Sequence, residues 1–521
     1  MKSKTKQIIM IGVVLFQSLF AYPLITMAEE NESKSVNTET TLEPKVALEE
    51  KTPQKPTLTN NLKQEKTVLQ AGETYETVFP DAALATVIAK AATGSEDITQ
   101  EVSQTDLNKI TSLTATSKGI VDLTGIDLLS KLTSLSISGN QITDISALNG
   151  LVNLSNLNVS NNKITSFNLN ANSNLPMLRA VDIRSNNLKN INVQDQPKLW
   201  TFKCDTGSSS ELTEVTLKNL PILIAVGNGS SAYQDDIVFS STPGLSKVIL
   251  ENLPSTSSEV KLDHCAIEEL VINNLPKVSV VIISYNKITT LEGLENLSAV
   301  SKIDAYENLV TEIENLHAFP KLQTLTVDNN HISVLPTSLK TENPVLTTLS
   351  AMNQTITLKQ KVIVSDLVLD NEVKNFGQIT TAKSISNKGT YQNNQIKWLF
   401  EDIKSVNAVD YQFSEPVQEA TIQGTFSGKV TQPIKASKVP VISADAEMNY
   451  PKNETVSEAA FFKDISASVT DDATLTSDFE SVVDFAKAGT YEVTLNAVNE
   501  DGVKAASVTV LVHIAKSPAP V

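Results

Sequence analysis

Residues 132–151 decide the fold, and they read LTSLSISGNQITDISALNGL. Leucine or isoleucine recurs there at fixed intervals, at Leu132, Leu135, Ile137, Ile142, Ile145, Leu148 and Leu151. The same spacing returns in residues 154–164 and in segments that begin at positions 178, 278, 300 and 322. The last three starts share one period of about 22 residues, and self-similarity at a fixed period of this length indicates a solenoid built from stacked coils.

The spacing within each copy has a physical reason. The LxxLxL part is typical of a short strand whose alternate side chains point inward. Asn140 follows that strand, and its amide can both donate to and accept from backbone groups of the turn and the adjacent coil. One coil buries too little apolar surface alone, so the stack must build one continuous core. The pattern predicts a leucine-rich-repeat solenoid over residues 110–355, mainly parallel strands with short helical or 3-10 returns.

The middle of the array departs from this pattern. Between Leu199 and Leu275 the asparagines are lost and the spacing varies. Four prolines follow one another at intervals of one period, half a period and one period, at Pro221, Pro243, Pro254 and Pro276. Segments such as 227–231 have the composition of loops. We therefore expect an irregular or bulging section with extra exposed loops.

The flanking segments predict further domains. Residues 79–81 read Phe-Pro-Asp and precede apolar residues at helical spacing, which favours a helical N-terminal cap over residues 72–109. After Leu346 the period ends. Residues 356–436 and 437–516 show short alternating strands, for example 491–497 and 508–514, with a turn at Asp501-Gly502. Two all-β, immunoglobulin-like sandwiches are expected there.

The N-terminus predicts export. Three lysines precede an apolar run at 8–20, and small residues at 26 and 28 fit a cleavage site, so residues 1–28 are predicted to be a signal peptide. A membrane anchor is disfavoured because Gln17 and Pro23 interrupt a short run. Residues 29–71 are rich in Glu, Lys, Thr and Pro, which predicts a disordered linker. Residues 517–521 are expected to be a tail, and no transmembrane segment is expected in the mature chain.

Composition excludes several classes of function. The chain has 521 residues and a formal net charge of −17, which argues against a binder of nucleic acid or anionic membranes. Two cysteines are too few for a disulfide-rich scaffold, and the four histidines are not spaced as zinc ligands are. Cys204 and Cys265 are expected to be buried thiols about 14 Å apart, too far for a disulfide. His264 adjoins Cys265 without a third orienting group, so no catalytic, cofactor-binding or metal residue is predicted, and the chain is not expected to be an enzyme.

The candidate site is the concave face of the solenoid, where repeat proteins usually bind. Residues between the repeat leucines point outward there. The predicted protein-binding residues are Asp182, Arg184, Lys203, Asp205, Lys261, Asp263, Val280, Ile282, Tyr285, Asp304, Tyr306 and Asp328. Among them, Val280, Ile282, Tyr285 and Tyr306 form an apolar and aromatic stripe, and such exposed clusters often mark interfaces. The alternative is a solvated polar face with no specific ligand.

The combination of motifs resembles the internalins, leucine-rich proteins exported by Listeria and related Gram-positive bacteria. The resemblance rests on the cap at 79–81, on NQITDI at 140–145 and on NQTITL at 353–358. FSGKVTQP at 426–433 is similar to the end of the family's domain fused to the repeats, and residues 440–514 resemble bacterial Ig-like repeats. An LPxTG sorting motif and glycine-tryptophan modules are absent from the sequence, which implies the freely secreted subgroup. The resemblance implies aromatic-rich concave faces in receptor-binding members, and with aromatic residues at only 5% of the chain this concave face is expected to be poor by comparison.

The resemblance implies a secreted module, expected to be a monomer, that binds a protein ligand, with a host protein as one candidate and a role in virulence. A structural component retained non-covalently at the bacterial envelope is the alternative, and an enzyme is a distant third. The sequence alone does not choose between host and bacterial partners.

Overall fold

The computed structural model describes residues 68–170, 173, 175–204, 211–227, 236–256, 258–314, 316 and 319–516. The expected signal peptide, most of the expected linker and the tail lie outside these residues. Within the described ranges, every helix is too short or too polar to cross a bilayer.

Three helices lie in the expected cap segment. They are α1 (Tyr75–Val78), α2 (Ala82–Thr93) and α3 (Gln104–Leu107). Asp81 precedes α2, and its Oδ1 accepts hydrogen bonds from the backbone N–H groups of Ala83 and Leu84. Its Oδ2 accepts from Val121 and Asp122, at 2.7 and 3.1 Å. One carboxylate therefore both begins the helix and ties the cap to the first coil.

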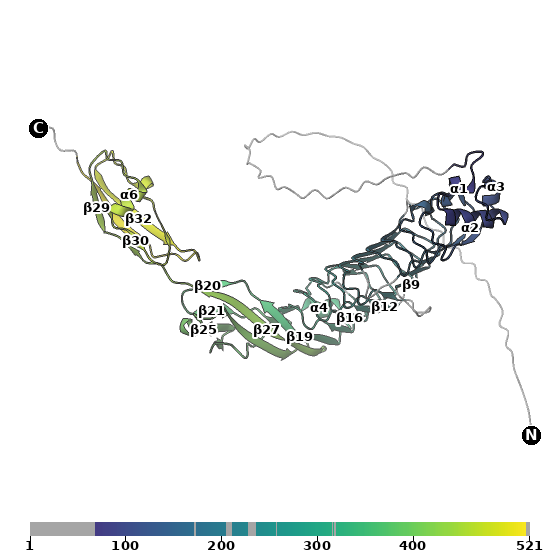
Figure 1. Cartoon of the computed structure of the whole chain (residues 1–521). Coiled ribbons are helices and arrows are strands. Elements are labelled where there is room, and N and C mark those ends of the chain that lie inside the picture. Colours follow the sequence, from purple (N-terminus) through teal and green to yellow (C-terminus); the bar gives the residue numbers. More distant parts are fainter. Residues whose placement is uncertain are drawn as a thin grey trace, which may run out of the picture. The chain divides into compact units, whose positions relative to one another are not determined.

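The repeat strands form one long parallel sheet (Figure 1). Its solenoid strands are β1 (Ser112–Thr114), β2 (Ser134–Ser136), β3 (Asn156–Asn158), β5 (Ala180–Asp182), β7 (Thr201–Lys203), β9 (Ala225–Gly227), β10 (Ile237–Val238), β12 (Glu259–Lys261), β14 (Val280–Ile282), β16 (Lys302–Asp304), β17 (Thr324–Thr326) and β19 (Thr348–Thr357). Leu113 pairs with Leu135 and Leu135 with Leu157, one whole repeat each time. These leucines are buried, so their neighbours along each strand point away from the core.

Buried asparagines join neighbouring coils, as expected from the repeat. Asn308 accepts a hydrogen bond from the backbone N–H of Ile288, at 3.1 Å, and donates to the carbonyls of Ile283 and Ala305. Equivalent contacts are made by Asn140, Asn162, Asn186, Asn286, Asn330 and Gln354. We call these seven residues the core amide ladder. They supply partners to backbone groups that would otherwise be buried without one.

The middle section departs from the regular repeat as expected, through the inserted half-coil described below, but it contains more strand than expected. A second parallel sheet crosses these coils, with strands β4 (Ser166–Leu169), β6 (Asn190–Gln194), β8 (Glu214–Lys218), β11 (Lys247–Glu251), β13 (Glu269–Asn273) and β15 (Leu294–Glu295). The short helical segments expected opposite the long sheet occur nearer the two ends of the solenoid, at η1 (Ile126–Leu128), η2 (Ser146–Leu148) and α4 (Ser338–Glu342). β8 reads EVTLK, with Val215 and Leu217 buried, and this period of two favours a strand over a helix.

One half-coil is inserted in the middle. Val226 of β9 pairs with Ile237 of β10, only half a repeat period later in the chain. In the second sheet Val215 pairs with Val248, one and a half periods later. Among the described strands, the long sheet therefore has one extra strand, β10, with no matching extra strand in the second sheet.

The long sheet continues beyond the solenoid. β19 pairs with β27 (Gln423–Ala436), and β27 with β26 (Ala408–Pro416). A Cβ at Gly424 would lie 1.7 Å from the Leu349 carbonyl oxygen, so only glycine fits where the two strands approach each other.

The remaining elements before the last segment are β18 (Val334–Leu335), β20 (Lys361–Ile363), β21 (Leu367–Asp370), β22 (Lys374–Asn375), β23 (Gln378–Ile379), β24 (Thr390–Gln392), β25 (Gln395–Trp398) and α5 (Phe400–Ile403). One hydrophobic core runs from Tyr75 to Ile434.

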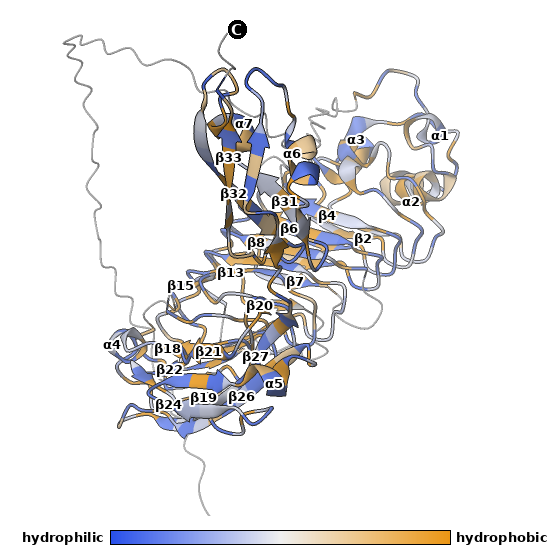
Figure 2. Cartoon of the chain, turned by 90° about the vertical axis from the view of Figure 1, so that its left-hand side faces the viewer, coloured by the Kyte–Doolittle hydropathy of each residue, from blue (hydrophilic) through white to orange (hydrophobic). Residues whose placement is uncertain are grey.

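The last segment has its own core. Its elements are β28 (Ile442–Ser443), β29 (Glu447–Tyr450), α6 (Glu458–Asp464), β30 (Ser468–Val469), β31 (Thr474–Ser477), α7 (Phe479–Val482), β32 (Gly489–Val498) and β33 (Val508–Ile514). β32 and β33 are antiparallel, which confirms the two strands expected at 491–497 and 508–514. Hydrophobic and hydrophilic residues are mixed along them in Figure 2, as alternation requires.

Candidate protein-binding face

The structure places the predicted binding residues along the long sheet. The positions that flank a buried strand residue hold Asp182, Lys203, Lys261, Val280, Ile282 and Asp304. Positions two residues beyond a strand hold Arg184, Asp263, Tyr306 and Asp328, and Tyr285 lies three beyond β14. Asp205 lies outside the described residues. That these residues bind a ligand stays a prediction.

Three rings from successive coils contact one another on this face, the first two stacked and the third tilted. The ring centroids of His264 and Tyr285 are 4.1 Å apart with planes at 21°, and those of Tyr285 and Tyr306 are 5.1 Å apart at 58°. Tyr285 is 40% exposed. We call His264, Tyr285 and Tyr306 the aromatic cluster. Val280 and Ile282 lie on β14, the strand that leads to Tyr285.

The turn geometry brings the first two rings together. His264 and Tyr285 occupy the same repeat position and have φ of 55° and 56°, the left-handed region. The Tyr306 hydroxyl accepts a hydrogen bond from the Asn329 amide at 2.8 Å, which fixes the third ring. The neighbouring Tyr285, and to a smaller extent desolvation, raise the pKa of Tyr306 above its usual value, so its hydroxyl stays neutral.

Charged groups border the aromatic cluster. Asp263 accepts hydrogen bonds from the Ser240 hydroxyl and from His264 Nδ1, the latter at 2.8 Å. Burial raises the pKa of Asp263, but these bonds and the charge of Lys261 outweigh it, and the net pKa is lowered. The carboxylate therefore stays ionised and holds the His264 ring in place.

A second polar group lies on β5 and β7. Arg184 contacts both carboxylate oxygens of Asp182, at 3.0 and 2.6 Å. Burial raises the pKa of Asp182, but the hydrogen bonds and charge of Arg184, with the charge of Lys203, outweigh burial and lower the net pKa. The Lys203 side chain is exposed. This region is thus an internally paired polar patch.

One predicted site residue does not point to solvent. Asp328 is only 7% exposed, and it accepts hydrogen bonds from the Ser350 hydroxyl and the Met352 backbone N–H of the next coil. The expectation that it is exposed was wrong. The sequence could not reveal this because both partners come from a different repeat.

The cysteines do not form a reactive site. Cys204 is buried, but Cys265 is only partly buried, which corrects the expectation for the latter. The Cys265 thiol donates to the Phe239 carbonyl at 3.0 Å, and burial raises its pKa to about 11. A protonated thiol is a poor nucleophile. Within the described ranges, no three His, Cys, Asp or Glu side chains gather as a metal site would require.

Sequence reasoning missed His264 as part of the candidate face. It considered this histidine only as a neighbour of Cys265. The available signal was the repeat position that His264 shares with Tyr285.

Comparisons with known proteins find domains of known families in parts of the chain. Three family descriptions match: the Internalin K domain (D3/D4) over residues 440–514, LRR adjacent over 377–435, and Leucine Rich repeats (2 copies) over 130–196. These matches support an internalin-type leucine-rich-repeat protein. Internalin-like proteins of this kind are known for protein–protein interaction, and their scaffold is not typically enzymatic.

The relatives of this internalin-type chain cover only parts of it. Internalin I of Listeria monocytogenes serotype 4b (strain F2365) is 49% identical over 89 residues, and Internalin I of serovar 1/2a (strain ATCC BAA-679 / EGD-e) is 42% identical over 123 residues. These matches cover 17% and 20% of the chain, and they span 5% and 7% of the two relatives.

Solved structures of internalins are also similar to this internalin-type chain. The functional domain of InlJ from Listeria monocytogenes is 20% identical, with a TM-score of 0.26, and the match covers 71% of this chain and 100% of InlJ. Listeria monocytogenes InlP is 15% identical with the same TM-score and coverage.

Proposed function

We propose that this chain is a non-catalytic module that binds a protein partner through the outward face of the long sheet. The aromatic cluster is the observation that carries the proposal. It places three rings beside Val280 and Ile282 on adjacent coils, at the surface.

Aromatic side chains on a rigid backbone are favoured as binding hot spots because they bury much surface and lose little conformational entropy. The backbone N–H of Tyr285 donates to the Tyr306 carbonyl at 2.9 Å, so neighbouring coils hold the rings in register. Lys261, Lys302 and Asp304 border the cluster and would serve as a polar rim.

The proposed setting is the host–bacterium interface, with the chain secreted and a host protein as its partner. The export pattern of residues 1–28 and the Listeria relatives support this setting. The second candidate is a structural component held non-covalently in the cell envelope. Cell fractionation separates the two, because the first predicts protein in the medium and the second predicts protein in the wall fraction.

A capture experiment tests the binding face. The mature chain and an Ile282→Asp/Tyr285→Asn variant serve as baits for host-cell surface proteins. Asparagine suits position 285 because Asn161 and Asn329 adopt the same left-handed turn. Val345→Asp, at another exposed site, is the matched control.

We expect a partner that the parent and the control capture and the double variant loses. Equal capture by the double variant would contradict the proposed face. If no host protein is captured, the envelope alternative is favoured. Circular dichroism confirms that each bait is folded.

A further inference from the structure

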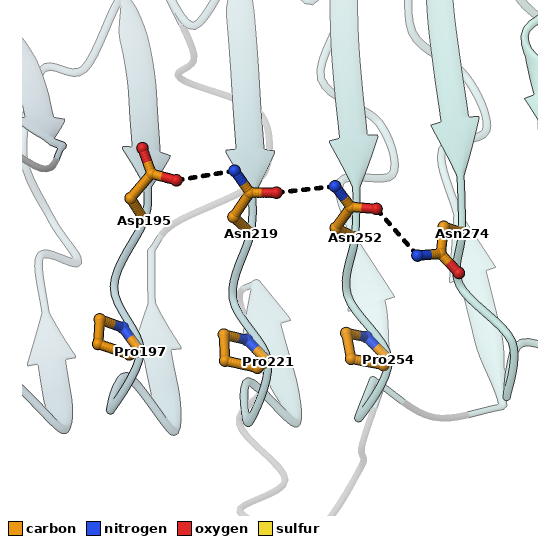
Figure 3. Close-up of a pocket in the computed structure, with 7 residues that line it drawn as sticks. All are labelled: Asp195, Pro197, Asn219, Pro221, Asn252, Pro254 and Asn274. Carbon is orange, nitrogen blue, oxygen red and sulfur yellow. Dashed lines mark hydrogen bonds between the residues drawn. The ribbon is translucent and has the colours of Figure 1, made fainter. Parts of the chain in front are cut away.

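A second row of amides lies on the opposite side of the coils from the aromatic cluster's sheet, where strands of the second sheet end. The row consists of three amides, Asn219, Asn252 and Asn274, and one carboxylate at its end, Asp195. They directly follow β8, β11, β13 and β6, respectively (Figure 3). All four have left-handed φ, between 54° and 59°. We call them the edge amide ladder.

The edge amide ladder is a directional chain of hydrogen bonds. Asn274 donates to Asn252 at 2.9 Å, Asn252 to Asn219 at 2.7 Å, and Asn219 to the Asp195 carboxylate at 2.7 Å. An amide has two N–H groups and two acceptor lone pairs. The ladder uses one of each on Asn219 and Asn252, so the remaining donor and acceptor can serve a ligand.

A row of prolines runs beside the edge amide ladder. Pro197, Pro221 and Pro254 each lie two residues further along the chain, and Figure 3 shows their rings in parallel. The seven residues line an open groove with a volume of about 420 Å³. One wall of the groove therefore presents amides and the other presents apolar rings. Trp200, which is 55% exposed, follows Pro197 by three residues.

We propose that this groove binds a linear, uncharged polysaccharide that lies across the coils. Sugar hydroxyls both donate and accept hydrogen bonds, as the amides do, and the C–H faces of the sugar rings match the proline rings. Neighbouring coils repeat every ~4.8 Å. This spacing is close to the length of one sugar in an extended β-linked chain, so successive sugars would meet equivalent amides.

Other polymers fit the groove less well. Among its seven lining residues only Asp195 is ionisable, and none is cationic, which disfavours nucleic acid and other polyanions. None is aromatic, unlike the grooves that bind proline-rich peptides. The groove crosses the ends of four strands and does not follow one strand edge, so a peptide could not add there as a further strand.

Binding is tested by titration calorimetry with two neutral probes. One is a hexamer of β-1,4-linked N-acetylglucosamine, as a bacterial-type backbone, and the other is an N-acetyllactosamine oligomer, as a host-type glycan. The probe that binds identifies the source of the polysaccharide. Binding of neither probe by the parent would overturn the proposal.

The variants compare the loss of amides inside the groove with the loss of one amide outside it. Asn219→Gly/Asn252→Gly removes two groove amides, and glycine keeps the left-handed turn without steric strain. Asn296→Gly removes an amide that also has left-handed φ and bonds to Asn273, outside the groove. We expect parent-like binding by the Asn296 variant and binding about tenfold weaker by the double variant. Equal binding by the double variant would overturn the proposal.

A second variant tests the groove without removing an amide. Pro221→Glu places a charged side chain in the groove at an exposed position, and it should also abolish binding. The Ile282→Asp/Tyr285→Asn variant should bind the glycan like the parent. If that variant loses glycan binding, the groove is not the site, whereas loss of only the protein partner leaves the groove proposal intact.

Discussion

The two amide ladders use the same residue type in opposite ways. In the core amide ladder, Asn308 is 4% exposed and bonds to backbone groups of two coils. In the edge amide ladder, Asn252 and its neighbours bond chiefly to one another at the surface. A buried amide gives backbone groups the hydrogen-bond partners that water would give them at the surface. Its removal therefore leaves buried backbone groups unpaired. When a surface amide is removed, water can bond to the groups that it leaves. The edge amide ladder is therefore not needed for stability in the same way and can serve another role.

The largest effect is expected at the core amide ladder. Asn308→Ala should lower the free energy of unfolding by about 3 kcal/mol, because the Ile288 N–H and the Ile283 carbonyl lose their buried partner. Urea titration followed by circular dichroism measures the change. A loss below about 1 kcal/mol would mean that water replaces the amide, and the contrast between the ladders would fail.

Cys265 marks a position where the core amide ladder lacks an amide. Because burial raises its pKa to about 11, its thiolate should be about 100-fold scarcer at pH 8 than in the unfolded chain. Alkylation by iodoacetamide should be slower in the native protein by a similar factor, and its rate should rise as pH approaches 11. Peptide mapping separates Cys265 from the buried Cys204. Fast native labelling at pH 8 would contradict this assignment.

Asp81 in the cap, like a residue of the core amide ladder, supplies acceptors to backbone N–H groups of two neighbouring segments. Burial raises its pKa, and the N–H groups of Val121, Leu84, Asp122 and Ala83 together lower it to a net value below its usual one. Asp81→Asn keeps one acceptor but loses the second, so we expect about 1 kcal/mol less stability at pH 7.

The pH dependence of the Asp81 effect has a definite sign. The folded pKa is depressed, so the stabilisation is present above the usual carboxyl pKa and is lost as pH falls through the folded value. The stability gap between parent and Asp81→Asn should therefore close at acidic pH, as thermal melts would measure. A gap that is constant with pH would exclude the carboxylate as its cause.

The smallest effect is expected at the edge amide ladder. Asn252→Gly should change the free energy of unfolding by less than about 0.5 kcal/mol, because glycine suits the left-handed turn and the freed Asn219 oxygen can bond to water. The same urea titration applies. A loss above about 2 kcal/mol, the size expected for a buried group left unpaired, would make the two ladders equivalent.

The repeat period was enough to predict the long sheet and the core amide ladder, because leucine and asparagine spacing reports inward positions directly. It did not predict the second sheet. Strand β8 carries its signal in only five residues, and nothing in them shows which coil lies beside them. The interval of one and a half periods between Pro221 and Pro254 was visible, but its meaning as an extra half-coil required the pairing of β9 with β10.

The candidate face was predictable in part for a similar reason. Tyr285 and Tyr306 could be placed from the repeat alone, since outward positions follow from the period. The stacking of His264 depends on a left-handed turn, and the burial of Asp328 depends on Ser350 from another coil. Contacts that depend on which side chain or turn a particular neighbouring coil carries are therefore the part that periodicity does not show.

The shared core from Tyr75 to Ile434 bears on how the solenoid opens. Stacked repeats usually fray from their ends, where the last coil lacks a neighbour. Here α2 packs into the core at one end, and β27 pairs with β19, the last solenoid strand, at the other. The junction of β9 and β10, where the two sheets fall out of step, is then the place where local opening should begin. The chain would lose its native contacts from the middle outward, with both ends the last to exchange their amide protons.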